Sequence, residues 1–172
     1  MLVNKIGFPD QHHLRAAQGW IELSEFDEAL NDLAKIRPQF RNLPAVLEVR
    51  WVLAANAHQW PKALSLAKKI ARLTPDNAEG WMYEARSLIE LRRPSEAYSL
   101  LLEAQQRFPG DEVIVYDLGC VCCALGRLNE AFSWVGKAIR LGGIQMELRA
   151  IGDPELRALW KDLRRNRRRP SA

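Results

Sequence analysis

Hydrophobic and polar residues alternate along most of the chain with the period of an α-helix. In one stretch, Leu47, Trp51 and Ala54 share a helical face. Residues 63–73 contain neither Gly nor Pro and are rich in strong helix formers. The pattern predicts a series of amphipathic helices separated by short turns. The clearest turn signals, each containing Pro and Asp, lie at residues 74–77 and 108–111.

A step of 34 residues relates several columns of the sequence. One column holds Ala29, Ala63, Ala97 and Ala131. A second column holds Ala17, Trp51, Ala85 and Gly119. Small side chains at fixed positions let antiparallel helices approach each other closely. A period of this length therefore predicts a helical repeat array.

With these columns in place, the chain resembles the tetratricopeptide repeat (TPR) family, whose repeat has the same length and forms a helix–turn–helix. The fourth repeat matches best, with Leu118, Gly119 and Ala131 at the usual positions. The second departs most in its first helix, where Arg50 and Trp51 stand in place of Leu and Gly. The resemblance implies an all-α fold: a right-handed solenoid of four helical hairpins with a C-terminal capping helix. The expected segments are an extension at 1–9, repeats at 10–43, 44–77, 78–111 and 112–145, a linker and capping helix at 146–163, and a basic tail at 164–172.

Local signals refine the helix ends. Pro38 should end the second helix of the first repeat near Ile36, because the residue before Pro avoids the α region. We therefore expect an irregular link at 37–43. Gly126 suits the left-handed conformation that often ends a helix. The equivalent residues are Ser24, His58 and Arg92, so their turns should be strained or different in shape.

The expected capping helix follows Gly142 and Gly143. Asp153 suits its N-cap and Pro154 its first helical position. An apolar stripe follows at helical spacing, formed by Leu156, Leu159, Trp160 and Leu163. Without such a cap, the last repeat of a solenoid would expose its apolar end.

The charge of the chain changes this picture only at its end. Residues 161–172 carry a net charge of +5, so the other residues sum to −1 within the formal total of +4. The arginines that follow the expected cap are Arg164, Arg165, Arg167, Arg168 and Arg169. Such a run can neutralise phosphates, which makes binding of nucleic acid or another acidic surface the alternative function. A solvated tail is the simpler interpretation.

The residues predict no catalytic chemistry. The sequence has no Gly-rich phosphate loop, nucleophile elbow or paired-histidine zinc motif. On a helix Cys120 and Cys123 share a face, but two thiols fall short of the four ligands of a structural zinc site. With Cys122, they are interpreted as small core residues, with a redox-sensitive pair as the alternative. His13 falls in a core-facing column. We expect no enzyme activity, no cofactor and no metal.

The location follows from what the sequence lacks. No apolar run is long enough to cross a membrane, and the first residues lack the features of a secretory leader. Three clustered cysteines do not resemble a disulfide framework. The expected location is the cytoplasm.

The resemblance also implies where a partner binds, because in this family the first helix of each repeat lines a concave groove. Transfer by register gives Leu14, Gln18, Glu48, Val52, Asn56, Met82, Arg86, Glu90, Tyr116 and Cys120. This mixed surface suits a peptide with apolar and polar side chains, and Met82 and Tyr116 are candidate anchors. In the alternative, these residues only solvate the inner wall and partners use the convex side.

One known subclass of the family grips the C-terminal carboxylate of chaperones with Lys, Asn and Arg. The corresponding residues here are Leu14, Gln18, Val49, Glu79 and Tyr83. Glu79 would repel a carboxylate, so a chaperone tail of that kind is not expected. The expected partner is another protein or peptide. Self-association stays open, because the edges and grooves of solenoids can pair.

Overall fold

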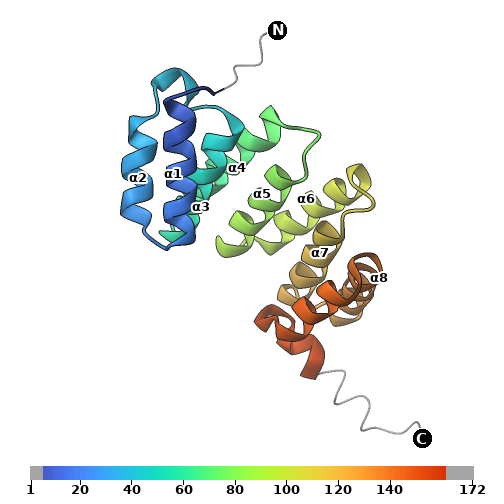
Figure 1. The fold of residues 1–172 in the computed structure, drawn as a ribbon. Helices are drawn as coiled ribbons and strands as arrows, with labels where there is room; N and C mark the ends of the chain where they lie inside the picture. Colours follow the sequence, from blue (N-terminus) through green and yellow to red (C-terminus); the bar gives the residue numbers. More distant parts are fainter. Residues whose placement is uncertain (1–5, 162–172) are drawn as a thin grey trace, which may run out of the picture. The chain divides into compact units, whose positions relative to one another are not determined.

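The computed structural model describes residues 6–161, which form helices joined by short turns, with no strand among them (Figure 1). The α-helices are α1 (Asp10–Glu22), α2 (Phe26–Lys35), α3 (Pro44–Asn56), α4 (Trp60–Leu73), α5 (Glu79–Glu90), α6 (Pro94–Arg107), α7 (Glu112–Ala124) and α8 (Leu128–Gly152). Two 3₁₀ turns are η1 (Pro38–Phe40) and η2 (Pro154–Leu156). Neighbouring helices pack in pairs, α1 with α2, α3 with α4, and α7 with α8. This order agrees with the predicted succession of helical hairpins.

The chain divides after Ser87, inside α5, into an N-terminal and a C-terminal compact unit. The N-terminal unit has a core formed by Leu14, Ala17, Ala29, Leu33, Ile36, Val46, Val49 and Leu53. The C-terminal unit has a core that includes Val115, Tyr116, Cys122, Ala131, Val135, Ala138 and Leu156.

The alanine column of the repeat lies inside these helix pairs. Ala29, Ala63, Ala97 and Ala131 are each 0% exposed. Gly119, in the other small-residue column, faces α8 so closely that an added Cβ would lie 2.6 Å from Cγ2 of Val135. The repeat is therefore visible in the sequence because close helix contacts exclude larger side chains.

Each first helix ends in the same left-handed turn. The φ angles are 62° at Ser24, 53° at His58, 61° at Arg92 and 74° at Gly126. In each turn the residue at positive φ and the next one donate backbone hydrogen bonds to the last helical turn, as in Ser24 N to Ile21 O (2.9 Å) and Glu25 N to Trp20 O (2.8 Å). The turns at Ser24, His58 and Arg92 were expected to be either strained or different in shape, and the second expectation is wrong. The non-glycine residues adopt the shape that Gly126 adopts.

The link after α2 is irregular, as predicted from Pro38. Helix α2 ends at Lys35, and Ile36 is already extended, with φ −65° and ψ 126°. The link contains the short turn η1 and is fastened to the start of α1. The backbone N of Arg37 donates to Oδ1 of Asp10 (2.7 Å), and the Arg37 guanidinium lies 2.6 Å from Oδ2.

The C-terminal end contains more helix than expected. At Gly143 the chain has φ 60° and ψ −146°, so α8 is kinked there. It continues as helix to Gly152, although a linker was expected from residue 146. Asp153 then caps η2 by accepting from the backbone N of Glu155 (2.8 Å), as predicted for an N-cap.

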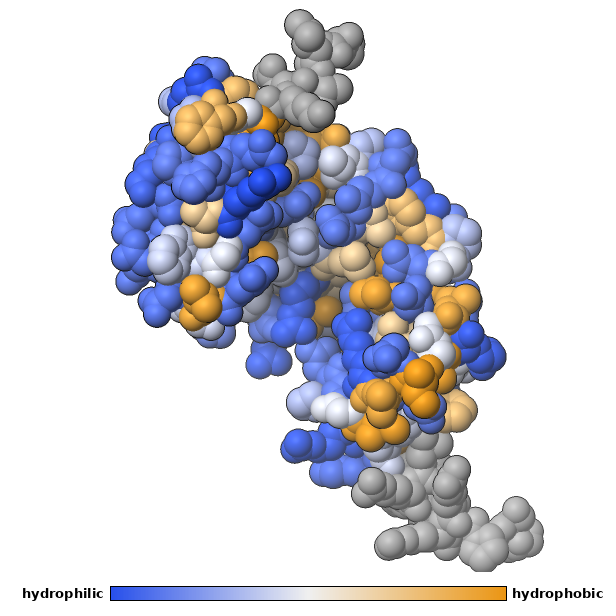
Figure 2. Space-filling view, viewed as in Figure 1, coloured by the Kyte–Doolittle hydropathy of each residue, from blue (hydrophilic) through white to orange (hydrophobic). Residues whose placement is uncertain are grey.

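The residues after this kink include both buried and exposed apolar side chains. Leu156 and Leu159 of the expected stripe are buried, Trp160 is half-buried, and Leu163 lies outside the described residues. The part of α8 after the kink exposes Ile144, Leu148 and Ile151, and apolar surface gathers in this part of the molecule (Figure 2). Within residues 6–161, no helix combines the length and apolar character that a membrane-spanning segment needs.

Candidate functional site

Side chains on the first helices of the N-terminal unit form an accessible surface. Gln18 of α1, Asn56 of α3 and Arg86 of α5 are exposed, whereas Glu48, Val52 and Met82 are partly exposed. We call these six residues the first-helix surface. Leu14, placed in the same groove by register, is instead 6% exposed and belongs to the hydrophobic core, where Ala17, Ala29 and Leu33 also lie.

An aromatic contact joins α3 to α5 beside this surface. The rings of Trp51 and Tyr83 stack with centroids 4.2 Å apart. The Trp51 Nε1 donates to Oγ of Ser87 (3.1 Å), and that hydroxyl donates to the backbone O of Tyr83 (2.8 Å). The large Trp51 side chain, which replaces a small residue of the repeat, thus holds two successive first helices together.

The same region carries negative charge. Burial raises the pKa of the Glu48 carboxyl, and the nearby carboxylate of Glu79 raises it further. Burial also raises the pKa of the Tyr83 hydroxyl, and the charges of Glu79 and Glu48 act in the same direction. An added positive charge would relieve the repulsion between these two glutamates. The first-helix surface also includes the exposed Arg86, so charges of both signs lie in this region.

In the C-terminal unit the predicted groove residues are covered, which corrects the expectation for Tyr116 and Cys120. Tyr116 is 0% exposed and Cys120 is 5% exposed. Both belong to a core that also contains Met146, Ala150 and Leu159 from the segment after the kink. Glu90, the remaining predicted groove residue, is partly exposed.

Asp153 fixes that segment to α7. The Tyr116 hydroxyl donates to Oδ2 of Asp153 (2.5 Å), and the Cys120 thiol lies 3.9 Å from the same oxygen. The Arg149 guanidinium sits 4.3 Å above the Tyr116 ring and 3.7 Å from Oδ1 of Asp117. Tyr116 and Cys120, predicted to contact a partner, therefore lie at an internal interface between α7 and the segment after the kink.

The cysteines are buried thiols without disulfides. Burial raises the pKa of Cys122 to about 12, and it also raises the pKa values of Cys120 and Cys123. Thiols with raised pKa values are poor nucleophiles and poor metal ligands at neutral pH. Among residues 6–161, no cluster of three or more His, Cys, Asp and Glu residues has the arrangement to hold a metal ion.

His13 serves a structural contact between α1 and α2. Its Nδ1 lies 3.1 Å from Oδ1 of Asp32, which also accepts from Nζ of Lys35 (2.9 Å). The Trp20 Nε1 donates to Oδ2 of Asp32 (3.0 Å). These hydrogen bonds hold the pKa of the Asp32 carboxyl below its ordinary value, the bond from Lys35 contributing most. His13 therefore links α1 to α2 through Asp32.

The arginines of the predicted tail, at 164–169, lie outside the described residues. Sequence reasoning missed a pocket between α2, α3 and α4. The sequence feature that could have indicated this pocket is Arg50, which stands in a column where the TPR pattern has Leu.

Comparison with solved structures decides the fold. A thermophilic TPR protein from Thermus thermophilus, TTC0263, superimposes with a TM-score of 0.68 at 21% identity, covering 77% of this chain and 74% of that one. MamA from Desulfovibrio magneticus RS-1 gives 0.67 at 20% identity, covering 80% and 77% of the two chains. The chain has the tetratricopeptide-repeat fold.

A third protein with the TPR fold is YrrB, described as having an unusual peptide-binding site. It gives a TM-score of 0.60 at 17% identity, covering 75% of this chain and 66% of that chain. No protein-family model and no curated protein matches the sequence. At these identities the likeness establishes the TPR fold, and the binding properties of the neighbours belong to those proteins.

Proposed function

We propose that the chain is a non-catalytic scaffold or adaptor that binds a peptide or protein segment on the first-helix surface of its N-terminal unit. The observation that carries this proposal is the accessibility of equivalent positions on three successive first helices, α1, α3 and α5. TPR folds commonly present such surfaces to other proteins, because stacked repeats offer extended binding faces.

The chemistry of the surface narrows the ligand. Val52 and Met82 supply apolar contacts, and the flexible Met side chain adapts to different partners. Glu48 and Glu79 supply negative charge beside them, and Arg86 supplies positive charge. The ligand we propose therefore combines apolar and charged side chains. The cytoplasm is the location we propose, because a reducing compartment preserves the three free thiols.

The test starts from peptides selected on the full chain by phage display, whose affinities are then measured by calorimetry. Met82→Gln and Val52→Gln should each weaken the best peptide about tenfold, because each removes a buried apolar contact. Leu73→Gln is the matched control, since Leu73 is a 49% exposed apolar residue of α4 outside this surface. Equal affinities of the peptide for wild type and Met82→Gln would contradict binding on the first-helix surface.

A second candidate is nucleic-acid binding through the arginines at 164–169. It is favoured by the +5 charge of residues 161–172 in a chain that is otherwise close to neutral.

A further inference from the structure

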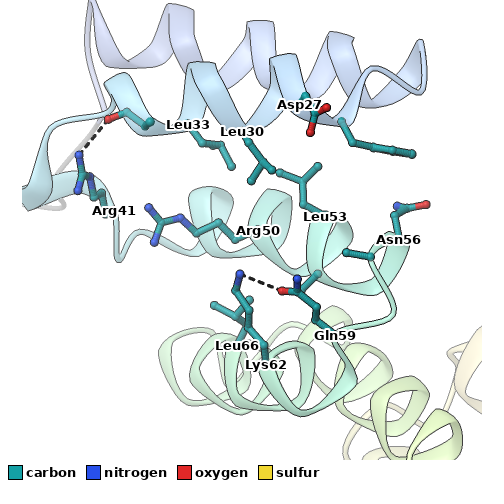
Figure 3. A pocket seen from close by; sticks show the side chains of 14 residues that line it. Asp27, Leu30, Leu33, Arg41, Arg50, Leu53, Asn56, Gln59, Lys62 and Leu66 are labelled. Carbon is teal, nitrogen blue, oxygen red and sulfur yellow. Dashed lines mark hydrogen bonds between the residues drawn. The ribbon is translucent and has the colours of Figure 1, made fainter.

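A pocket of about 520 Å³ lies between α2, α3 and α4 of the N-terminal unit (Figure 3). Its volume is within the range of roughly 300–1,000 Å³ that is common for ligand sites. Leucines from all three helices form its apolar part: Leu30, Leu33, Leu53 and Leu66. Leu30 is 50% exposed, so the apolar surface reaches the rim and is accessible from solvent.

One end of the pocket is cationic. The guanidinium groups of Arg41 and Arg50 point to the same end, whereas Asp27 lies at the other (Figure 3). Arg41 is held in place because it donates to the backbone O of Ile36 (2.7 Å) and of Ala34 (2.9 Å). Lys62 adds a third positive charge on α4, where its Nζ donates to Oε1 of Gln59 (3.2 Å).

Arg50 lacks a counterion. Within residues 6–161, its guanidinium makes no hydrogen bond or ion pair, although the side chain is partly buried. Burial lowers the pKa of Arg50, and the positive charge of Arg41 lowers it further. Both effects would be relieved by an anion at this end of the pocket.

The next repeat also has a charged residue in this column, and there the charge is paired. Glu84 stands 34 residues after Arg50 in the same column and is likewise partly buried. Oε1 of Glu84 forms an ion pair with Nζ of Lys68 of α4, at a distance of 3.8 Å. The residue equivalent to Lys68 one repeat earlier is the uncharged Ala34, and Arg41, which also lines the pocket, is a cation. The partly buried charge of Arg50 therefore has no acidic partner among residues 6–161, and an anionic ligand would supply one.

We propose that this pocket binds a short acidic peptide segment of a partner protein, with a Leu-like side chain between Leu30 and Leu53 and a carboxylate against Arg50. The pocket is too small for a folded domain, and its exposed rim lets a peptide chain continue on both sides. The charge of the site selects an acidic ligand, whereas the first-helix surface carries charges of both signs. The pocket is therefore a second site, and its test does not depend on whether the first-helix surface binds a ligand.

The probe is a fluorescein-labelled short peptide of alternating Leu and Glu, and its binding to the full chain is measured by fluorescence anisotropy. Arg50→Gln should weaken binding about tenfold or more, because a charge-assisted hydrogen bond is lost. Leu30→Gln should weaken it as well, because an apolar wall is lost. Neither change removes a described hydrogen bond, and circular dichroism verifies that both variants fold.

The matched control is Arg15→Gln, which removes an exposed arginine of α1 outside the pocket. Because the arginines at 164–169 also attract acidic peptides, the test is the difference between variants. A peptide with Gln in place of Glu should bind as weakly to wild type as the acidic peptide binds to Arg50→Gln. Equal binding of the acidic peptide by wild type, Arg50→Gln and Arg15→Gln would overturn the proposal, and so would undetectable binding to wild type.

Discussion

Individual residues in the turns of this protein adopt conformations that their side chains disfavour. Ser24, His58 and Arg92 have positive φ angles between 53° and 62°, a region that costs a residue with a Cβ about 1–2 kcal/mol. The turns keep their shape because their hydrogen bonds are made by the backbone, which is the same in every residue. Arg93 N, for example, donates to Leu88 O at 2.9 Å, and Arg127 N to Cys122 O at the same distance.

Glycine at these positions should stabilise the protein. Ser24→Gly and Arg92→Gly relieve the left-handed strain but increase the freedom of the unfolded chain, so we expect a net gain of about 0.5–1 kcal/mol for each. Both side chains are exposed, so little packing is lost. Urea denaturation followed by circular dichroism measures the change.

The control for these variants is Ser99→Gly in the middle of α6, an exposed helical position where glycine should cost about 0.5–1 kcal/mol. If Ser24→Gly and Arg92→Gly were destabilised like Ser99→Gly, the positive φ angles would not carry strain.

The same turns show what sequence can and cannot predict at this scale. The repeat period located all four turns, and Gly126 identified the conformation of one. The shared shape of the others could not be predicted from Ser, His and Arg, because side-chain preference opposes it and backbone hydrogen bonding prevails. In contrast, Pro38 predicted the end of α2 well, since its effect on the preceding residue is local.

At the scale of elements, the contact between Asp10 and Arg37 joins the start of α1 to the link after α2. The side chain of Asp10 is 0% exposed. Hydrogen bonds from the Arg37 side chain and backbone hold the pKa of the Asp10 carboxyl below its ordinary value of 3.8. The sequence gives no sign of this pair, because 27 residues separate its members and nothing local relates them.

The contact between Asp10 and Arg37 should make the stability of the fold depend on pH in the acidic range. A lowered pKa in the folded state means that the contribution of Asp10 is complete above its ordinary value and is lost as the pH falls below 3.8 toward the folded value. Asp10→Asn should therefore lower the melting temperature at neutral pH. The difference from wild type should shrink in acid, where Asp10 itself becomes protonated.

Thermal denaturation between neutral pH and about pH 3 measures this difference, a range that spans the ordinary pKa of Asp. Glu28→Gln controls for the loss of one negative charge, because Glu28 is an exposed residue of α2. A melting temperature of Asp10→Asn equal to that of wild type at neutral pH would contradict the role of the contact.

The C-terminal elements illustrate a second limit. The N-cap at Asp153 and the buried residues Leu156 and Leu159 follow from local spacing, and the structure confirms them. The bond from the Tyr116 hydroxyl to Asp153 depends on how the chain turns at Gly143, which no local pattern specifies. The predicted binding residues Tyr116 and Cys120 are therefore internal.

For the whole molecule, the period of the repeat predicted a helical repeat array, because the alanine that marks it is buried in each repeat. The family resemblance predicted the TPR fold, which the solved structures confirm. The binding surfaces were harder to predict. Their chemistry arises at departures from the repeat, such as Trp51 against Tyr83 and Arg50 in the pocket beside Arg41. A departure marks a position in the sequence, but only the fold identifies which groups surround it.

The distribution of charge leads to the last prediction. Residues 161–172 hold a net +5, and the rest of the chain sums to −1, so any affinity for nucleic acid should reside in the arginines at 164–169. Truncation after Leu163 should abolish retention of single-stranded RNA at low salt and leave helicity unchanged. Each phosphate contact contributes about −0.7 to the slope of log K against log salt for single strands, so wild-type binding should weaken steeply as salt rises. Full retention of RNA by the truncated chain would instead place a binding surface within the repeats, where Arg41 and Arg50 are the first candidates to test.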